Sequence, residues 1–401
     1  MPRYTEVSDA GSGVRVLVAH NAYQQRGGED SVVEAEAALL ASRGHAVERF
    51  LRHNDAIADM SRLDAAVQTV WSAPAARDFE AVLRAFRPDV VHVHNTFPLM
   101  SPAIYWVANR LRVPVVQTLH NFRLLCPGAL FLREGRVCED CSGRLPWRGV
   151  VRGCYRESRP ASAALAGMLV VHRAAGTWRN KVSRYIALNE FCRAKFVAGG
   201  LPAERIVVKP NFVDFSAPAE VERAGFLFVG RLSAEKGVTA LADAARQVPG
   251  VALRVAGSGP EASCLEGIAG VAALGALDGS TVRAEMGRAM ALVLPSIWYE
   301  NFPRTLVEAY ACGLPVIASR IGALAELVRD GETGLLFEPG NAADLADKLR
   351  WAQAHPQRMA EMGRKARALY EAEFTAERNY AQLMAIYRDA IDENNASGVA
   401  A

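Results

Sequence analysis

The sequence predicts an α/β protein made of two doubly wound, Rossmann-like domains that face each other across a cleft. The chain has 401 residues, about twice the usual size of one domain, so at least two domains are expected. Apolar, β-rich runs alternate with helical patterns, which is typical of parallel sheets built from βαβ units. The same rhythm restarts after a stretch rich in proline and charge at 210–224, which we interpret as the linker.

The first half is expected to contain five strands, each a short apolar run. They lie at 14–20, 46–50, 89–94, 114–120 and 185–189. Helical patterns occupy 31–43, which Gly44 ends as a C′ glycine, and 102–111. The N-terminal domain would then cover 1–209, with a cysteine-rich insertion at 122–158.

The second half repeats this pattern after the linker. Its strands are expected at 226–229, 251–256, 271–274, 291–294 and 315–318, and its helices at 237–247, 280–290, 305–312 and 324–329. From residue 342 onward the pattern is helical. We therefore expect a C-terminal domain at 225–375, a last helix at 376–392 and a disordered tail at 393–401.

The composition excludes several classes of protein. The 46 basic and 43 acidic residues leave a formal net charge of +3, so the whole chain is neither a strongly basic nucleic-acid binder nor an acidic disordered protein. Seven cysteines are too few for a disulfide-stabilised scaffold of this length. The sequence has no run of about 18 apolar residues and no signal-peptide pattern, so the expected location is the cytoplasm, with peripheral contact at the inner membrane face.

The most informative segment, 296–308, follows an apolar strand and leads into a helix. With Thr305 as the helix cap, Glu300 lies in the loop and Glu308 one turn into the helix. Two carboxylates at these positions suit vicinal hydroxyls, because each accepts two hydrogen bonds, although ordinary surface glutamates can have the same spacing. Further donors are expected from the free backbone amides of Asn301, Phe302 and Arg304.

Three further features lie where βα loops or strand ends are expected. The loop from Arg231 to Lys236 places two cations and free amides before a helix, which suits an anion. Gly27 and Gly28 follow the first strand and let the backbone approach a ligand closely. His120 ends a strand, where residues of a binding cleft lie. Solvated charges, a flexible loop and a structural histidine are the respective alternatives.

The segment from Glu300 to Glu308 resembles the E-x7-E motif of retaining glycosyltransferases of family 4, which have the GT-B fold. Residues 229–237, VGRLSAEKG, are similar to the G-R-L-x-x-x-K-G loop of that family, and the resemblance extends over 14–340. It implies that the C-terminal domain holds a nucleotide-diphosphate sugar and that the N-terminal domain recruits an acceptor. It also implies that the last helix crosses back to the first domain.

The resemblance implies a role for each candidate residue. Glu300 would contact hydroxyls of the donor sugar, and Glu308 would accept hydrogen bonds from the ribose. Arg231 and Lys236 would bind the diphosphate and offset the charge of the leaving group. Other contacts are implied for Gly27, Gly28, His120, for Asn189 where the family often has serine, for Gly257 near the base, and for Asn301, Phe302, Arg304 and Thr305.

The implied reaction retains the configuration at the anomeric carbon by same-face displacement, with the leaving diphosphate helping to deprotonate the acceptor hydroxyl. No catalytic metal is then expected. Two alternatives stay open. One is another nucleotide-sugar enzyme of this fold, an epimerase or a phosphorylase, and the other is a zinc-ordered binding protein without catalysis.

Four of the seven cysteines lie close together in the insertion: Cys126, Cys138, Cys141 and Cys154. The inner two form a C-x2-C pair, and the outer two could complete a tetrahedral structural zinc site. A loop with little core would gain order from such a metal. A redox pair and free thiols are the alternatives.

The residues that follow this insertion are strongly basic. Nine Lys or Arg side chains in 144–184 face a single acid, Glu157. Such a stretch suits an anionic membrane surface or a lipid-linked acceptor, and a solvated helix face is the alternative.

Overall fold

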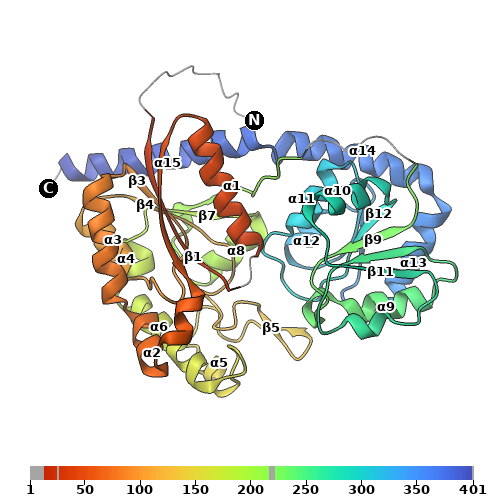
Figure 1. Ribbon diagram of the computed structural model, residues 1–401, viewed down its shortest axis with the longest axis horizontal. Coiled ribbons are helices and arrows are strands. Elements are labelled where there is room, and N and C mark those ends of the chain that lie inside the picture. Colours follow the sequence, from red (N-terminus) through yellow and green to blue (C-terminus); the bar gives the residue numbers. More distant parts are fainter. Residues whose placement is uncertain (1–12, 25–26, 216–221, 400–401) are drawn as a thin grey trace. The chain divides into compact units, whose positions relative to one another are not determined.

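The computed structural model describes residues 13–24, 27–215 and 222–399 (Figure 1). These residues form two six-stranded sheets of parallel strands and a short two-stranded hairpin, which confirms the predicted α/β class with two Rossmann-like domains. By packing, the chain divides into two compact units. The first comprises Met1–Gln117, Asn180–Ser183 and Ile386–Ala401, and the second comprises Thr118–Arg179 and Arg184–Ala385.

The first sheet has the strand order β2-β1-β3-β4-β7-β8. Every side chain of β3 is buried, which is typical of a parallel strand covered on both faces. The strands are β1 (Arg15–Ala22), β2 (Ala46–His53), β3 (Val90–Asn95), β4 (Val115–Thr118), β7 (Arg184–Ala187) and β8 (Ile206–Val208). The helices of this half are α1 (Gly28–Ser42), α2 (Arg62–Val70), α3 (Ala73–Phe86), α4 (Ala103–Arg110), α5 (Trp147–Val151), α6 (Arg159–Ala174), α7 (Thr177–Asn180) and α8 (Glu190–Ala198).

The second sheet has the order β11-β10-β9-β12-β13-β14, and its alternating side chains enter two separate apolar cores. Phe226 and Phe228 pack in one core with α9 and α13, whereas Leu227 packs in the other with α11. Figure 1 shows α9 and α13 on one side of this sheet and α10 and α11 on the other. The strands are β9 (Phe226–Val229), β10 (Leu253–Ala256), β11 (Val271–Gly275), β12 (Ala291–Leu294), β13 (Val316–Ser319) and β14 (Gly334–Phe337); the helices are α9 (Val238–Arg246), α10 (Gly279–Arg288), α11 (Arg304–Ala311), α12 (Gly322–Leu327), α13 (Ala342–Ala354), α14 (Pro356–Glu373) and α15 (Ala376–Val399).

Several elements were not predicted from the sequence. Strands β8 and β14, which have three and four residues, are two of them. Helix α3 carries its own start signals, because Ser72 caps it and a proline lies in its first turn. The cysteine-rich insertion contains a hairpin of β5 (Leu132–Arg133) and β6 (Arg136–Val137) as well as α5.

Two expectations about helix ends were wrong. Helix α11 begins at Arg304 after an N-cap at Pro303, so Thr305 lies inside the helix and does not cap it. Pro303 fixes an extended entry to the helix without donating a hydrogen bond itself. Helix α15 continues to Val399, so helix replaces the disordered tail expected from 393 onward as far as the structure describes it. Within the described ranges, no helix is long and apolar enough to cross a membrane.

Candidate active site

The carboxylate of Glu300 is the centre of a hydrogen-bonded cluster at the carboxyl end of β12. Its Oε1 accepts from Lys236 Nζ at 2.6 Å, from Ser296 Oγ at 2.8 Å and from Trp298 Nε1 at 3.1 Å. The Glu300 side chain is 10% exposed and the Lys236 side chain 27% exposed. The cluster thus fixes one carboxylate oxygen and keeps an ammonium group within reach of solvent.

A close backbone approach brings Lys236 to this cluster. Gly237 has φ 71°, and a Cβ there would lie 1.9 Å from the carbonyl oxygen of Pro295. Only glycine permits this contact, which joins the loop after β9 to the loop after β12. The amide of Ile297 also donates to the carbonyl of Glu235 at 3.0 Å. The two loops predicted to hold the donor therefore lie against each other.

Arg231 has a different partner from Lys236. Its guanidinium pairs with Glu235, and its side chain is 66% exposed. Burial alone would raise the pKa of Glu235, but hydrogen bonds from Ser233 and Arg231 outweigh it and hold that pKa below its usual range. Glu235 is thus a charged acceptor that orients Arg231, a partner that the sequence did not suggest.

Glu308 lies one turn into α11, as predicted, and its Oε1 accepts from Arg304 Nε at 2.9 Å. Burial raises the pKa of Glu308, and the nearby Arg304 only partly counters it. Phe302 faces the core, where its ring centroid lies 6.3 Å from that of Phe374. Among the residues of this segment that were predicted to bind the donor, Arg304 and Glu308 thus form an ion pair on α11, and the side chain of Phe302 packs against the core.

Asn301 ties the loop after β12 to two other chain segments. Its Nδ2 donates to the carbonyl of Leu119 at 2.6 Å, and its own carbonyl accepts from Asn189 Nδ2 at 2.6 Å. Asn189 Oδ1 accepts from the amide of Cys192 at 2.8 Å and so caps α8. The structure therefore brings Asn189 and Asn301 together, and gives both of them partners within the protein. His120, which is half-buried, directly follows Leu119.

The remaining predicted residues include three glycines, which lie in two separate parts of the chain. Gly257 has φ 148°, and a Cβ there would lie 1.8 Å from the carbonyl oxygen of Gly230, so the packing of two loops alone requires a glycine. Gly27 caps α1, and its amide donates to Asp30 Oδ2 at 2.7 Å. Among the described residues beyond its chain neighbours and its own helix, no atom lies within 4 Å of a Cβ built at Gly28. The residues before Gly27, 25–26, lie outside the described residues.

Sequence reasoning missed a second carboxylate beside this site. Glu139 Oε1 accepts from Tyr299 Oη at 2.9 Å and from Lys195 Nζ at 2.6 Å. The Lys195 ammonium also lies 5.1 Å from the Tyr299 ring centroid. Burial and the Glu139 carboxylate raise the pKa of Tyr299 to about 12, so this hydroxyl stays a donor. The only sequence signal was the position of Glu139 inside the C-x2-C pair.

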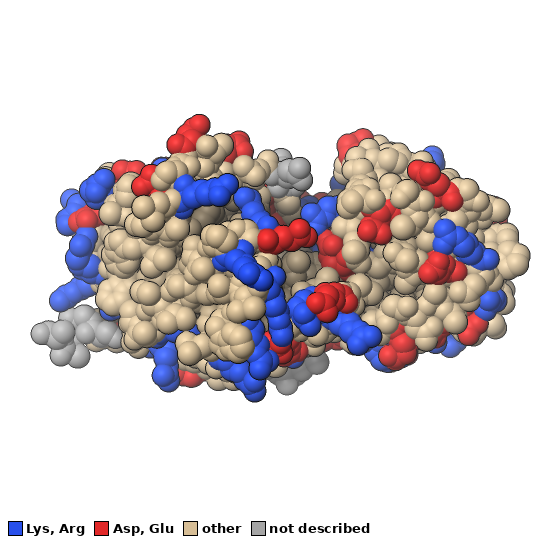
Figure 2. Space-filling view, turned by 90° about the horizontal axis from the view of Figure 1, so that it is seen from below, with Lys and Arg blue, Asp and Glu red and all other residues tan. Residues whose placement is uncertain are grey.

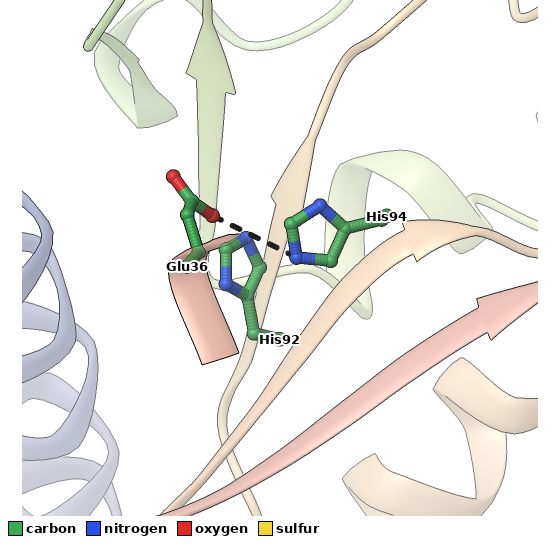
Figure 3. Close-up of side chains that lie close together, drawn as sticks. All are labelled: Glu36, His92 and His94. Atoms are coloured by element: carbon green, nitrogen blue, oxygen red, sulfur yellow. Dashed lines mark ion pairs between the residues drawn. The ribbon is translucent and has the colours of Figure 1, made fainter. Parts of the chain in front are cut away.

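A buried polar cluster lies in the first unit (Figure 3). Glu36 from α1 points toward His94 of β3, with 3.8 Å between Glu36 Oε2 and His94 Nε2. The His92 ring lies beside the His94 ring, with 4.1 Å between the ring centroids and 36° between the ring planes. His92 Nδ1 lies 2.7 Å from Tyr387 Oη on α15. All these side chains are sealed from solvent, so the cluster can order the first unit but offers no open position to a substrate.

The basic stretch is partly neutralised by a residue just before it. Asp140 pairs with Arg152 at 2.6 Å and with Arg148 at 3.5 Å. Arg173 donates instead to the carbonyls of Arg144 and Leu124, at 2.7 Å each. On the face drawn in Figure 2, Lys and Arg side chains likewise lie among Asp and Glu. The stretch is therefore less uniformly positive than its composition indicates.

Two family models match this chain. The model described as "Glycosyl transferase 4-like domain" matches residues 27–211, and the model described as "Glycosyl transferases group 1" matches residues 212–369. The junction of the two matches lies at the beginning of the linker expected at 210–224.

Curated relatives and solved structures agree with these matches. The chain is 30% identical over 307 residues to a glycogen synthase of Mycobacterium tuberculosis, covering 73% of this chain and 66% of the relative. It is 31% identical over 337 residues to a D-inositol 3-phosphate glycosyltransferase of Mycobacterium bovis, covering 79% and 65%. The chain thus spans about two thirds of the length of these relatives.

Among solved structures, sucrose-phosphate synthase from Thermosynechococcus elongatus has a TM-score of 0.71 at 20% identity, covering 95% of this chain and 100% of that one. HepE of Anabaena in complex with UDP has a TM-score of 0.64 at 20% identity, covering 92% and 98%. At this level of identity the likeness establishes the fold alone.

Proposed function

Because this chain belongs to the group 1 glycosyl transferases, with a 4-like domain preceding the group 1 domain, we propose that it moves a sugar from a nucleotide-diphosphate sugar to a hydroxyl of a glycan or lipid-linked acceptor. The observation that carries the proposal is the pair of Lys236 and Glu300, which places a cation and a carboxylate 2.6 Å apart at the end of β12. The ammonium of Lys236 can bind a diphosphate, and the carboxylate of Glu300 can accept hydrogen bonds from sugar hydroxyls.

The chemistry follows from where charge develops. As the bond between the anomeric carbon and the diphosphate oxygen breaks, negative charge grows on the leaving group, and Lys236 and Arg231 are the cations that offset it. The acceptor hydroxyl attacks the same face of the sugar, and its proton passes to the departing phosphate oxygen. The configuration at the anomeric carbon is retained, and no metal is required.

The carboxylates have binding roles. Glu300 accepts hydrogen bonds from donor-sugar hydroxyls, while Ser296 and Trp298 keep its orientation fixed. Glu308 accepts from the ribose hydroxyls, with Arg304 holding it in place. We assign His120 to the donor sugar and Gly27 and Gly28 to the phosphates, because each follows the carboxyl end of a strand.

We further propose that α5 and α6 contact an anionic membrane that carries a lipid-linked acceptor. Apolar side chains are exposed on these adjacent helices, among them Trp147 (59%), Val151 (55%) and Val171 (50%), and at Leu145 (67%) just before α5. Arginines flank them, which suits a surface of acyl chains and anionic headgroups. The flanking arginines are Arg144, Arg148, Arg152, Arg156 and Arg159.

The donor proposal is tested with a panel of nucleotide sugars. One donor should raise the melting temperature and release its nucleoside diphosphate, and the Glu300→Gln variant should lose about a hundredfold in turnover while it stays folded. Full activity of Glu300→Gln would refute the site assignment, and a lack of protection or turnover with every donor would refute the activity.

The membrane proposal is tested by sedimentation with phosphatidylglycerol vesicles and with phosphatidylcholine vesicles. The protein should pellet with the anionic vesicles only, and Leu145→Asp should weaken this binding. Leu63→Asp is the matched control, because Leu63 on α2 is 74% exposed but lies outside the proposed surface. Equal binding by both variants and the parent protein would contradict the proposal.

A further inference from the structure

The four cysteines of the insertion converge in the fold, although the chain between them is mostly irregular. All four are free thiols. Cys141 interacts electrostatically with each of the other three, and Cys154 does so with Cys126 and Cys138. A Cβ built at Gly128 would lie 3.6 Å from the Cβ of Cys154, so the first and last cysteines of the group come from touching segments. The chain from 126 to 154 thus folds so that cysteines from its separate segments lie near one another.

The C-x2-C pair forms a tight turn directly after the β5–β6 hairpin. The amide of Cys138 donates to the carbonyl of Phe131 at 2.7 Å, and the amide of Ser142 donates to the carbonyl of Glu139 at 3.0 Å. Cys154 follows α5, where its amide donates to the carbonyl of Gly149 at 2.9 Å. Cys138 and Cys141 thus follow the hairpin, Cys126 precedes it and Cys154 follows the short helix, and structural zinc sites likewise draw cysteines from separate segments of the chain.

A cation lies beside one of the four sulfurs. The guanidinium of Arg152 lies 3.8 Å from the Cys138 sulfur. Four thiolates around one divalent cation carry a net charge of −2. A hydrogen-bond donor outside the ligand shell, such as the Arg152 guanidinium, stabilises this negative charge.

The backbone of the insertion also needs an external constraint. Five residues other than glycine adopt left-handed conformations here, which persist only where their surroundings enforce them. These residues are Ala129 (φ 64°), Phe131 (φ 50°), Glu134 (φ 49°), Arg156 (φ 52°) and Glu157 (φ 54°). Phe122, Leu125 and Phe131 are buried and order one part of the segment, and a bound metal is a physical source of order for the turns that carry the cysteines.

We propose that Cys126, Cys138, Cys141 and Cys154 bind one structural zinc ion as a closed tetrahedral site. Among the described residues, three metal-ligand atoms lie within 4.8 Å of one another only in the Glu36, His92 and His94 cluster. The four sulfurs must therefore turn inward to reach the Zn–S distance of about 2.3 Å. Movement of the cysteine side chains and of the turns that carry them supplies this approach.

The zinc has a consequence for the sugar-transfer site, and this step rests on the proposed function. Glu139 lies between the two ligands of the C-x2-C turn and holds Tyr299 and Lys195. Tyr299 directly precedes Glu300. An ordered turn therefore positions the loop that carries the Glu300 carboxylate, and Glu139 acts as a positioning residue.

The first experiment measures metal in the full chain purified without chelator. We expect about one zinc per chain, lost in Cys138→Ser and Cys141→Ser and retained in the control Cys264→Ser, since Cys264 lies outside the insertion. Folded protein without zinc, iron in place of zinc, or a mass two hydrogens lower for each disulfide would overturn the proposal.

A second measurement covers the case in which the serine variants do not fold. A mercurial reagent titrated into the parent protein should release the zinc as four thiols react, and reaction of those thiols without any zinc release would refute the site. Glu139→Gln should keep its zinc and lose about tenfold in kcat with little change in donor KM. Zinc binding without any sugar transfer would leave the metal site standing and refute the proposed function.

Discussion

Two clusters of ionisable side chains differ in one physical respect. At the end of β12, Lys236 and Glu300 are 27% and 10% exposed, and the carboxylate has three donors. In the first unit, His94 on β3 and Glu36 on α1 are 0% and 2% exposed. An enclosed cluster can stabilise a fold, whereas a cluster that keeps a cation at the solvent edge can exchange a protein partner for a substrate. Exposure of the cation, more than the number of charges, separates the two.

The largest effect is expected at the open cluster. Lys236→Ala should lower kcat/KM about 10²- to 10³-fold, because it removes a cation that we propose offsets the charge of the leaving diphosphate. Stability should change little, since Ser296 and Trp298 still donate to Glu300. Steady-state kinetics and thermal unfolding measure the two effects, with Lys348→Ala as the control for a half-buried lysine on α13. Equal losses in both variants would remove Lys236 from the site.

Glu308 gives an intermediate effect that depends on pH. Burial raises the pKa of Glu308, so as the pH falls this carboxylate takes up its proton at a higher pH than an ordinary glutamate does. The donor KM should rise over that pH range, because the protonated group accepts fewer hydrogen bonds. Glu308→Gln should raise the donor KM about tenfold and abolish this part of the pH profile. A KM profile unchanged by the substitution would contradict the ribose role.

The same shift makes a prediction about stability. A carboxyl group whose pKa is raised by folding binds its proton more tightly in the folded state, so its contribution falls as the pH rises through that window. At neutral pH the Glu308→Gln variant should therefore unfold at a temperature equal to or above that of the parent protein. A marked loss of stability at neutral pH would show that the pair with Arg304 outweighs the cost of burial.

The enclosed cluster should respond in the opposite way. Tyr387→Phe removes the hydroxyl that lies 2.7 Å from His92 Nδ1 and should lower the free energy of unfolding by about 1 to 2 kcal/mol. The donor KM should stay unchanged, because no substrate reaches buried groups. Urea unfolding and kinetics on the same preparation check both parts, and a raised KM with normal stability would place this cluster in the functional site.

The sequence was informative where an apolar run was uninterrupted or where several motif residues lay close together. Apolar runs located β9 and β12 to the residue, and the E-x7-E spacing located Glu300 in a loop and Glu308 inside a helix. It was uninformative about partners. Nothing in the spacing showed that Asn189 donates to the carbonyl of Asn301, or that Glu235 binds Arg231.

By itself, then, the sequence determined the α/β class and the positions of strands such as β9 and β12, because hydrophobic periodicity is a local property. The tertiary structure alone decided which groups meet. It brought Lys236, 64 positions away, to Glu300 through the glycine contact at Gly237, and it brought Glu139 to Tyr299 across 160 positions. Such contacts depend on the packing of separate loops, which no local pattern records.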